Sequence, residues 1–234
     1  MNANEDNLHN VRMPGEDPSY RRARNRLLGA EQALRRQIEE VAALRRKLPP
    51  GGLVPQDYVF QELPRDSAVS NPRSVPLSAL FGNHDTLIAY SFMYGPRAKA
   101  PCPMCSAMLD SLDRAATHIG QRAALVVIAR SPIERIVDFG RKRGWSGLRL
   151  LSSEGNDYNR DYFAENDKGD QMPVLNVFRR TKEGIRHFWH SELLYVRGSE
   201  GEHPRHVDMI WPLWNVLDLT PEGRGADWLP RLEY

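Results

Sequence analysis

The first fifth of the chain carries apolar residues at helical spacing. Residues 20–48 contain no proline, and an aliphatic residue recurs every seventh position, at Leu27, Leu34, Val41 and Leu48. Such a repeat places these side chains along one face of a helix. We therefore predict one long amphipathic helix over residues 20–48, with an imperfect seam because the intervening Gln37 is polar.

A domain boundary follows this helix. The segment Pro49-Pro50-Gly51-Gly52 cannot continue a helix and marks a linker. Residues 1–19 are polar, contain two prolines, and predict a loose arm. We therefore predict an N-terminal arm and helix over residues 1–52 and a second domain over residues 53–234.

The larger part of the chain alternates between short apolar runs and amphipathic segments. The runs rich in β-branched and aromatic residues predict strands, and the segments with apolar residues at helical spacing predict helices. In order, we expect strand 86–94, a helix starting near residue 103, strand 123–129, helix 132–143, strand 148–151, a hairpin of 174–178 with 185–190, and helix 207–217. This order predicts an α/β fold. We expect the proline-rich stretch 64–76 to be irregular.

Charge and hydropathy narrow the classes of partner. The formal net charge of +2 is too small to indicate nucleic acid or a membrane surface as a general partner. Residues 20–48 hold nine basic and three acidic side chains with no aromatic residue interleaved among them, which favours a solvated face over a nucleic-acid-binding helix. We expect this helix to pack on its own domain or on a second subunit, forming a homodimer. The polar start and the lack of a long apolar run indicate a cytoplasmic protein without a signal or membrane span.

The two cysteines carry the most specific chemical signal. Cys102 and Cys105 are three residues apart, whereas a disulfide framework would show several cysteines at wide spacings. Pro103 occupies the position of a first helical residue, where proline is favoured, so Cys102 is predicted at the N-cap. There the helix dipole and unpaired N–H groups stabilise a thiolate. Cys105 lies one turn further along the same face, which suits a resolving thiol.

Zinc binding is the competing interpretation of this pair. Structural zinc takes four ligands, so two histidines would have to complete the site. His187 and His190 stand at odd spacing on a predicted strand, and we expect their side chains to face opposite ways. His203 and His206, near the last helix, are geometrically acceptable. Because only one CxxC motif is present, redox chemistry without a metal is favoured.

Several segments together resemble a known family. The matching stretches are 75–82, 90–96, 102–106, 152–159 and 217–224. In their order and combination they are similar to the bacterial family called domain of unknown function 899, described as dithiol–disulfide oxidoreductases. The resemblance implies a thioredoxin-like fold, with a central mixed sheet flanked by helices, and a redox pair at Cys102 and Cys105.

The same fold makes a proline before a strand informative. Met172-Pro173 directly precedes the predicted strand 174–178. In thioredoxin folds a cis proline at this point faces the cysteine pair and presents backbone to the substrate. The extra strand near 148–151 is similar to the peroxiredoxin branch. That branch carries a threonine two residues before its reactive cysteine, and here Ala100-Pro101 precedes Cys102. We therefore rank dithiol exchange above peroxidase activity.

These observations lead to a specific expectation. Cys102 attacks a substrate disulfide, Cys105 resolves the mixed disulfide, and a thiol reductant system supplies electrons, with no metal or organic cofactor. Pro173 and Met172 shape the docking surface, and Tyr94 and Met104 contact the substrate at its rim. The alternative is a non-catalytic scaffold whose cysteines are incidental or bind zinc.

Overall fold

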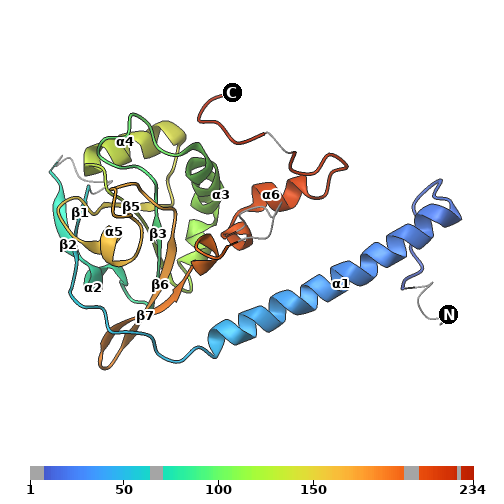
Figure 1. The fold of residues 1–234 in the computed structure, drawn as a ribbon, viewed down its shortest axis with the longest axis horizontal. Helices are drawn as coiled ribbons and strands as arrows, with labels where there is room; N and C mark the ends of the chain where they lie inside the picture. The colour runs from blue at the N-terminus through green and yellow to red at the C-terminus, as the bar shows by residue number, and fades with distance from the viewer. Residues whose placement is uncertain (1–7, 64–70, 198–205, 226–227) are drawn as a thin grey trace. The chain divides into compact units, whose positions relative to one another are not determined.

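A computed structural model describes residues 8–63, 71–197, 206–225 and 228–234 (Figure 1). The chain divides into two compact units, residues 1–49 and residues 50–234. Among the described residues, no helix combines the length and the apolar character needed to cross a membrane.

The first unit is dominated by one long helix, α1, Pro18–Arg46 (Figure 1). Asp17 caps its N-terminus, because the carboxylate accepts the backbone N–H groups of Ser19 at 2.7 Å and Tyr20 at 2.9 Å. Several apolar side chains of this helix are exposed: Leu34 is 60% and Ile38 61% exposed. The other described residues of the first unit do not cover them.

The second unit is built on one seven-stranded mixed sheet. Its strand order is β2-β1-β5-β4-β3-β6-β7. The strands are β1 Val59–Glu62, β2 Arg73–Pro76, β3 Thr86–Ser91, β4 Ala124–Ala129, β5 Arg149–Ser152, β6 Leu175–Thr181 and β7 Gly184–His190. The neighbours β3, β4 and β5 run parallel, whereas β6, β7, β1 and β2 pair antiparallel.

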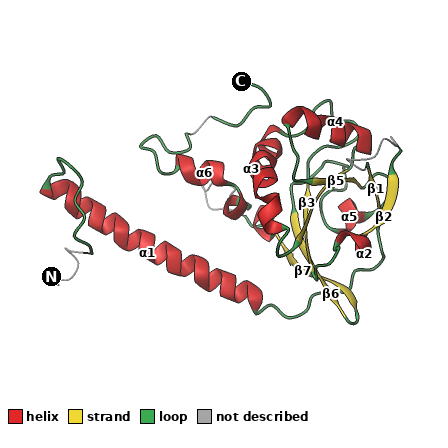
Figure 2. Cartoon of the chain, turned by 180° about the vertical axis from the view of Figure 1, so that it is seen from behind, coloured by secondary structure: helices red, strands yellow, loops and turns green. Residues whose placement is uncertain are grey.

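Helices cover both faces of this sheet (Figures 1 and 2). Beyond α1 they are α2 Leu77–Leu80, α3 Pro103–Ile119, α4 Ile133–Arg143, α5 Tyr158–Asp161 and α6 Pro212–Leu217. The helices α3, α4 and α6 pack on one face, and α2 and α5 on the other. With α3 and α4 as the connections between parallel strands, and an antiparallel hairpin followed by a last helix, the unit has a thioredoxin-like fold.

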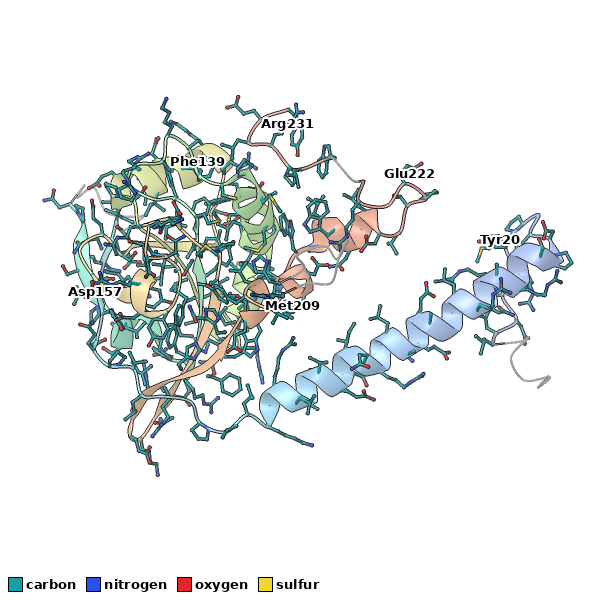
Figure 3. The ribbon with its side chains drawn as sticks, viewed as in Figure 1. Tyr20, Phe139, Asp157, Met209, Glu222 and Arg231 are labelled. Atoms are coloured by element: carbon teal, nitrogen blue, oxygen red, sulfur yellow. The ribbon has the colours of Figure 1, made fainter. Side chains whose placement is uncertain are left out.

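Alternation along the strands gives each face its own core. On β3, Tyr90 packs with α3 and α4, whereas Leu87 and Ala89 pack in the opposite core with α2 and α5. Figure 3 shows the side chains filling both sides of the sheet, with Phe139 among those on α4. The side chain of a residue on β6 or β7 therefore packs into one core or the other, depending on the register of its strand.

Two predicted segments have a different secondary structure in the protein. Within the stretch expected to be irregular, residues 73–76 form β2, which pairs with β1 from Val59 to Glu62. The remainder, 64–70, lies outside the described residues. The predicted helix 207–217 is instead a short 3-10 turn, Asp208–Ile210, followed by α6. The break falls at Pro212, because proline starts a helix better than it continues one.

The prediction that His187 and His190 face opposite ways is wrong. A bulge shifts the register of β7 against β6: Asn176 pairs with His190 and Val177 with Trp189, but Phe178 pairs with His187. Because β7 has one extra residue at the bulge, side chains three positions apart across it, rather than two, point to the same face of the sheet. Both imidazole rings therefore lie on one face, with centroids 6.1 Å apart.

Candidate active site

Cys102 lies at the N-terminus of α3, after the loop that follows the buried strand β3. After β3, the backbone N–H of Cys102 donates to the Met93 carbonyl at 3.0 Å. Cys102 has the extended backbone of an N-cap, and Pro103 begins α3, as the sequence predicts. Proline fits here because its missing N–H would have had no helical partner. The thiol is thus fixed beside the free N–H groups of the first helical turn. We call Cys102, Cys105 and this first turn the cysteine tip.

The surroundings of Cys102 favour its thiolate. A hydrogen bond from the Cys105 side chain, joined by the backbone N–H groups of Cys105 and Met104, lowers the pKa of Cys102 to about 6. Burial acts in the opposite direction, since it disfavours charge. The directed hydrogen bonds outweigh desolvation, and Cys102 is largely ionised at neutral pH.

Cys105 has the opposite character. Its side chain is only 4% exposed, and it faces the core between β3 and α3. Its hydrogen bond to Cys102, together with burial and the nearby Cys102 charge, raises the pKa of Cys105 well above that of an ordinary thiol. Both cysteines are free thiols in this structure. The arrangement is therefore an asymmetric pair, with one ionised and one protonated sulfur.

Tyr90 is a member of the site that the sequence analysis missed. Its hydroxyl is hydrogen-bonded to Cys105, which partly offsets the other effects on the pKa of that thiol. Tyr90 itself is buried, and burial raises its pKa well above the usual value. The sequence predicts a buried strand over residues 86–94. Side chains alternate between the two faces of the sheet, and only the structure shows that Tyr90 is on the face that packs against α3.

The segment Met172-Pro173 reaches the same end of the sheet. The backbone N–H of Ser91, the last residue of β3, donates to the carbonyl of Val174 at 2.8 Å. A ring nitrogen of His206 donates to the Pro173 carbonyl at 3.0 Å. The Met172–Pro173 bond is trans, since no cis peptide occurs among the described residues. In this respect the segment departs from the cis proline associated with thioredoxin folds.

The two remaining candidates have different settings. Met104 lies in the first turn of α3 and is half-buried. Tyr94 is buried and packs against Phe92 and Phe139, with ring centroids 6.0 Å and 6.1 Å away. The guanidinium of Arg135 lies 4.8 Å above its ring. Tyr94 thus supports the loop before Cys102 from the core side.

The histidines considered for zinc do not join the cysteines. His187 packs with Phe178 and Tyr162 on the face that α2 and α5 cover, whereas both cysteines belong to the core under α3. His203 lies outside the described residues. Within the described part of the chain, no three His, Cys, Asp or Glu side chains are grouped so as to hold a metal ion.

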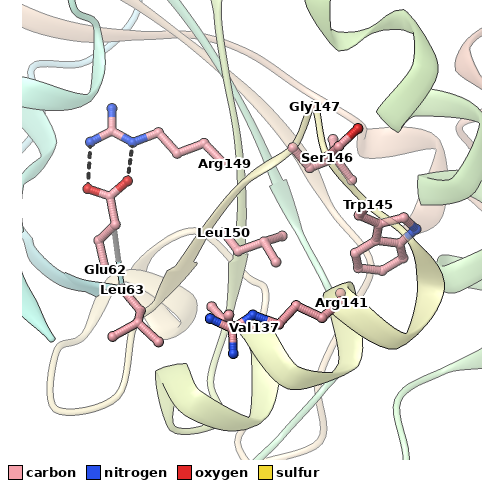
Figure 4. Close-up of a pocket in the computed structure, with 11 residues that line it drawn as sticks. Glu62, Leu63, Val137, Arg141, Trp145, Ser146, Gly147, Arg149 and Leu150 are labelled. Atoms are coloured by element: carbon pink, nitrogen blue, oxygen red, sulfur yellow. Dashed lines mark hydrogen bonds and ion pairs between the residues drawn. The ribbon is translucent and has the colours of Figure 1, made fainter. Parts of the chain in front are cut away.

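A hollow of about 470 Å³ lies beside α4 and β5 (Figure 4). Glu62 at its edge is paired with Arg149, the Nε to Oε1 distance being 2.7 Å, and also with Arg73. These hydrogen-bonded pairs lower the pKa of Glu62 against the effect of its burial, so the carboxylate serves as a structural anion. Nothing in this arrangement extends the chemistry of the cysteine tip.

Fold and geometry together define a class: a thioredoxin-like protein with a dithiol at the N-terminal tip of α3, the helix that follows β3. Within that class, the chain belongs to the family described as "Bacterial protein of unknown function (DUF899)", whose model matches residues 11–234. No curated protein matches the chain.

Several solved structures are similar to this chain. Peroxidoxin BcpB from Mycobacterium tuberculosis has 18% identity, with 70% of this chain and 94% of that chain covered and a TM-score of 0.46. Reduced 2-Cys peroxiredoxin from Plasmodium vivax has 15% identity, coverage of 73% and 96%, and a TM-score of 0.47. A secreted Mycobacterium tuberculosis disulfide oxidoreductase homologous to E. coli DsbE has 17% identity, coverage of 53% and 76%, and a TM-score of 0.37.

Proposed function

We propose that this protein is a thiol–disulfide oxidoreductase in which Cys102 is the nucleophile and Cys105 the resolving thiol. The observation that carries the proposal is the asymmetry of the cysteine tip. Hydrogen bonds from Cys105 and from the first helical turn lower the pKa of Cys102 to about 6, while the pKa of Cys105 is raised. A thiolate is the attacking species in disulfide exchange, and a pKa near ambient pH suits that role.

The proposed reaction has two steps. The Cys102 thiolate attacks one sulfur of a substrate disulfide and forms a mixed disulfide, while the second substrate sulfur leaves as a thiolate. Cys105 gives up its proton, with the Tyr90 hydroxyl hydrogen-bonded to its sulfur, and attacks Cys102. The first departing substrate sulfur takes a proton from solvent and the second takes the proton of Cys105, so the substrate leaves as two thiols with two added electrons and the cysteine pair becomes a disulfide. A cellular dithiol reductant restores it by the same exchange chemistry.

The substrate docks, in this proposal, on the surface around Cys102. Met104 contributes a flexible apolar side chain in the first turn of α3, and Met172-Pro173 contributes the neighbouring end of the sheet, where β6 begins. Tyr94 holds the intervening loop in place from below. Because both electrons reside on sulfur, the reaction needs neither a metal nor an organic cofactor. A reducing cytoplasm is the compartment in which such a pair is regenerated.

Trapping tests this proposal directly. The Cys105→Ser variant, incubated with a model disulfide such as oxidised glutathione, should stall as a mixed disulfide on Cys102, visible by mass spectrometry and released by dithiothreitol. The Cys102→Ser variant is the matched control and should form no such adduct. Equal labelling of the two variants, or of neither, would contradict the assigned roles. Wild-type behaviour of the double-serine variant in the cell would favour the scaffold alternative.

We also propose that a second copy of the chain covers the apolar stripe of α1. Leu27, Leu34, Ile38 and Leu44 are all more than half exposed on this 29-residue helix. A seven-residue apolar repeat of this length is typical of helices that pair in a coiled coil. The full chain should sediment as a dimer, and Leu34→Glu with Ile38→Glu should make it monomeric. A wild-type monomer at micromolar concentration would contradict this.

A further inference from the structure

The face of the sheet opposite the cysteine tip contains an aromatic hollow of about 720 Å³. His187 and His190 line it from β7, Tyr162 and Phe163 from the turn after α5, and Tyr195 from the turn that follows β7. We call this hollow, defined by these five side chains, the histidine pocket. It exists because the β7 bulge turns both imidazoles to one side.

Hydrogen bonding leaves one buried nitrogen of this pocket without a partner. His187 Nε2 donates to Asn176 Oδ1 at 2.9 Å, so its Nδ1 is an acceptor. His190 donates to the backbone carbonyl of Tyr162. His190 is 9% exposed, and its Nε2 has no hydrogen-bond partner among the described residues. A buried acceptor in this condition calls for an incoming donor.

The walls of the histidine pocket are flat rings. Tyr162 stacks on His187 with centroids 5.5 Å apart, and Tyr195 stacks on His190 at 5.8 Å. Phe163 is 65% exposed at the rim. It holds a φ of +56°, the one positive value among the described residues other than glycine. Large side chains rarely adopt this conformation, and such strain collects at functional sites.

The charge of the pocket is one-sided. Two carboxylates line it, those of Asp161 and Glu192, and none of the lining residues is Lys or Arg. Asp161 accepts the hydroxyl of Tyr58 at 2.5 Å, whereas the exposed Glu192 stands at the rim close enough to influence both imidazoles. Anions would be repelled here, and cations attracted.

We propose that the histidine pocket binds a small aromatic amine that also carries a ring hydroxyl. The ligand ring packs against Phe163, and its ammonium group pairs with Glu192. Its hydroxyl donates to His190 Nε2 after the exposed Tyr195 ring, whose hydroxyl donates to the Phe163 carbonyl at 2.8 Å, moves off the His190 ring. This is a binding function on the face opposite the cysteine tip and does not depend on the redox proposal.

Three ligands of matched shape test the chemistry by calorimetry on the full chain. Tyramine carries both the hydroxyl and the ammonium, phenethylamine lacks the hydroxyl, and 4-hydroxyphenylacetate replaces the ammonium by a carboxylate. Tyramine should bind, phenethylamine about fivefold more weakly, and the carboxylate at least about tenfold more weakly. No tyramine binding at millimolar concentration, or equal binding of the carboxylate, would overturn the proposal.

Two variants locate the site. Glu192→Gln changes an exposed side chain and should weaken tyramine severalfold, whereas Glu134→Gln, exposed on α4, is the matched control and should not. His190→Phe keeps a ring but removes the acceptor, so tyramine should lose its advantage over phenethylamine. If His190→Phe fails to fold, the Glu192→Gln result decides: an unchanged tyramine affinity there would overturn the assignment.

Discussion

On one face of the sheet Cys102 is half-buried at a helix tip, and on the other face His190 is buried among aromatic rings. Burial disfavours the charged form of both groups, raising the pKa of a thiol and lowering that of an imidazole. At Cys102, hydrogen bonds from Cys105 and the α3 backbone overcome that effect, and the pKa falls to about 6.

At His190 burial prevails. It lowers the pKa of His190 despite a backbone hydrogen bond to Tyr162 and the nearby charge of Glu192. Where burial dominates, as at His190, the side chain stays neutral. The half-buried Cys102 thiol ionises only because hydrogen-bond donors point at its sulfur. One face therefore presents a thiolate, and the other presents imidazoles kept neutral by burial.

The largest expected effect comes from removing the anion altogether. Cys102→Ser should lower the rate of disulfide reduction by at least about 1,000-fold, because a hydroxyl cannot replace a thiolate nucleophile at neutral pH. A turbidity assay of insulin reduction measures this. His118→Ala, exposed on the far part of α3, is the control and should retain the rate. Retained reduction in Cys102→Ser would place the reactive sulfur elsewhere.

Next in size is the loss of the strongest donor to Cys102. Cys105→Ala removes the hydrogen bond that contributes most to the lowered pKa of Cys102, so that pKa should rise by about one unit. Cys105→Ser keeps a donor of similar reach and should leave the pKa near the wild-type value. Iodoacetamide alkylation against pH follows the single thiol in each variant. Identical profiles for Ala and Ser would show that the helix tip alone sets the pKa.

A smaller effect should appear in the pH dependence of stability. Burial lowers the pKa of both His187 and His190 in the folded state. An unfolded histidine has a pKa near 6.5, so the unfolded chain binds more protons below that pH. The folded state is therefore at its full stability, as far as these two histidines are concerned, above about pH 6.5. It loses stability as the pH falls through their folded-state pKa values.

Urea unfolding at pH 7.5, 6.5 and 5.5 measures this loss. The Cys102→Ser background removes the separate contribution of the thiolate, which is lost as the pH falls from about 8.5 toward 6. In that background His190→Phe should show a shallower decline in the free energy of unfolding than its parent. An unchanged decline would assign the acid sensitivity to other groups.

The smallest effect concerns the strained rim of the histidine pocket. Phe163→Asn places a residue that tolerates positive φ where a phenyl ring is largely exposed, and should raise the free energy of unfolding by about 0.5–1 kcal/mol. The same change should weaken tyramine binding, since an aromatic wall is lost. Thermal unfolding and calorimetry report the two effects. A loss of stability would mean that the ring contributes more by packing than it costs in backbone strain.

The sequence by itself determined the elements of the cysteine tip. A strand, a loop and Cys102-Pro103 before an apolar helical repeat require only local rules, so the N-cap position of Cys102 and the inward position of Cys105 followed directly. Gly144 likewise ends α4 with a φ of +73°, as a glycine after a basic last turn predicts.

Only the tertiary structure decided the groups that depend on pairing between distant segments. Tyr90 meets Cys105 because of strand parity against α3, and β2 forms only because β1 is there to pair with it. The histidine pocket depends on a single bulge between β6 and β7, which the alternation of residues along one strand cannot show. A one-residue change in register turns side chains to the other face, so sequence spacing placed the helix-tip thiols but misplaced the imidazoles.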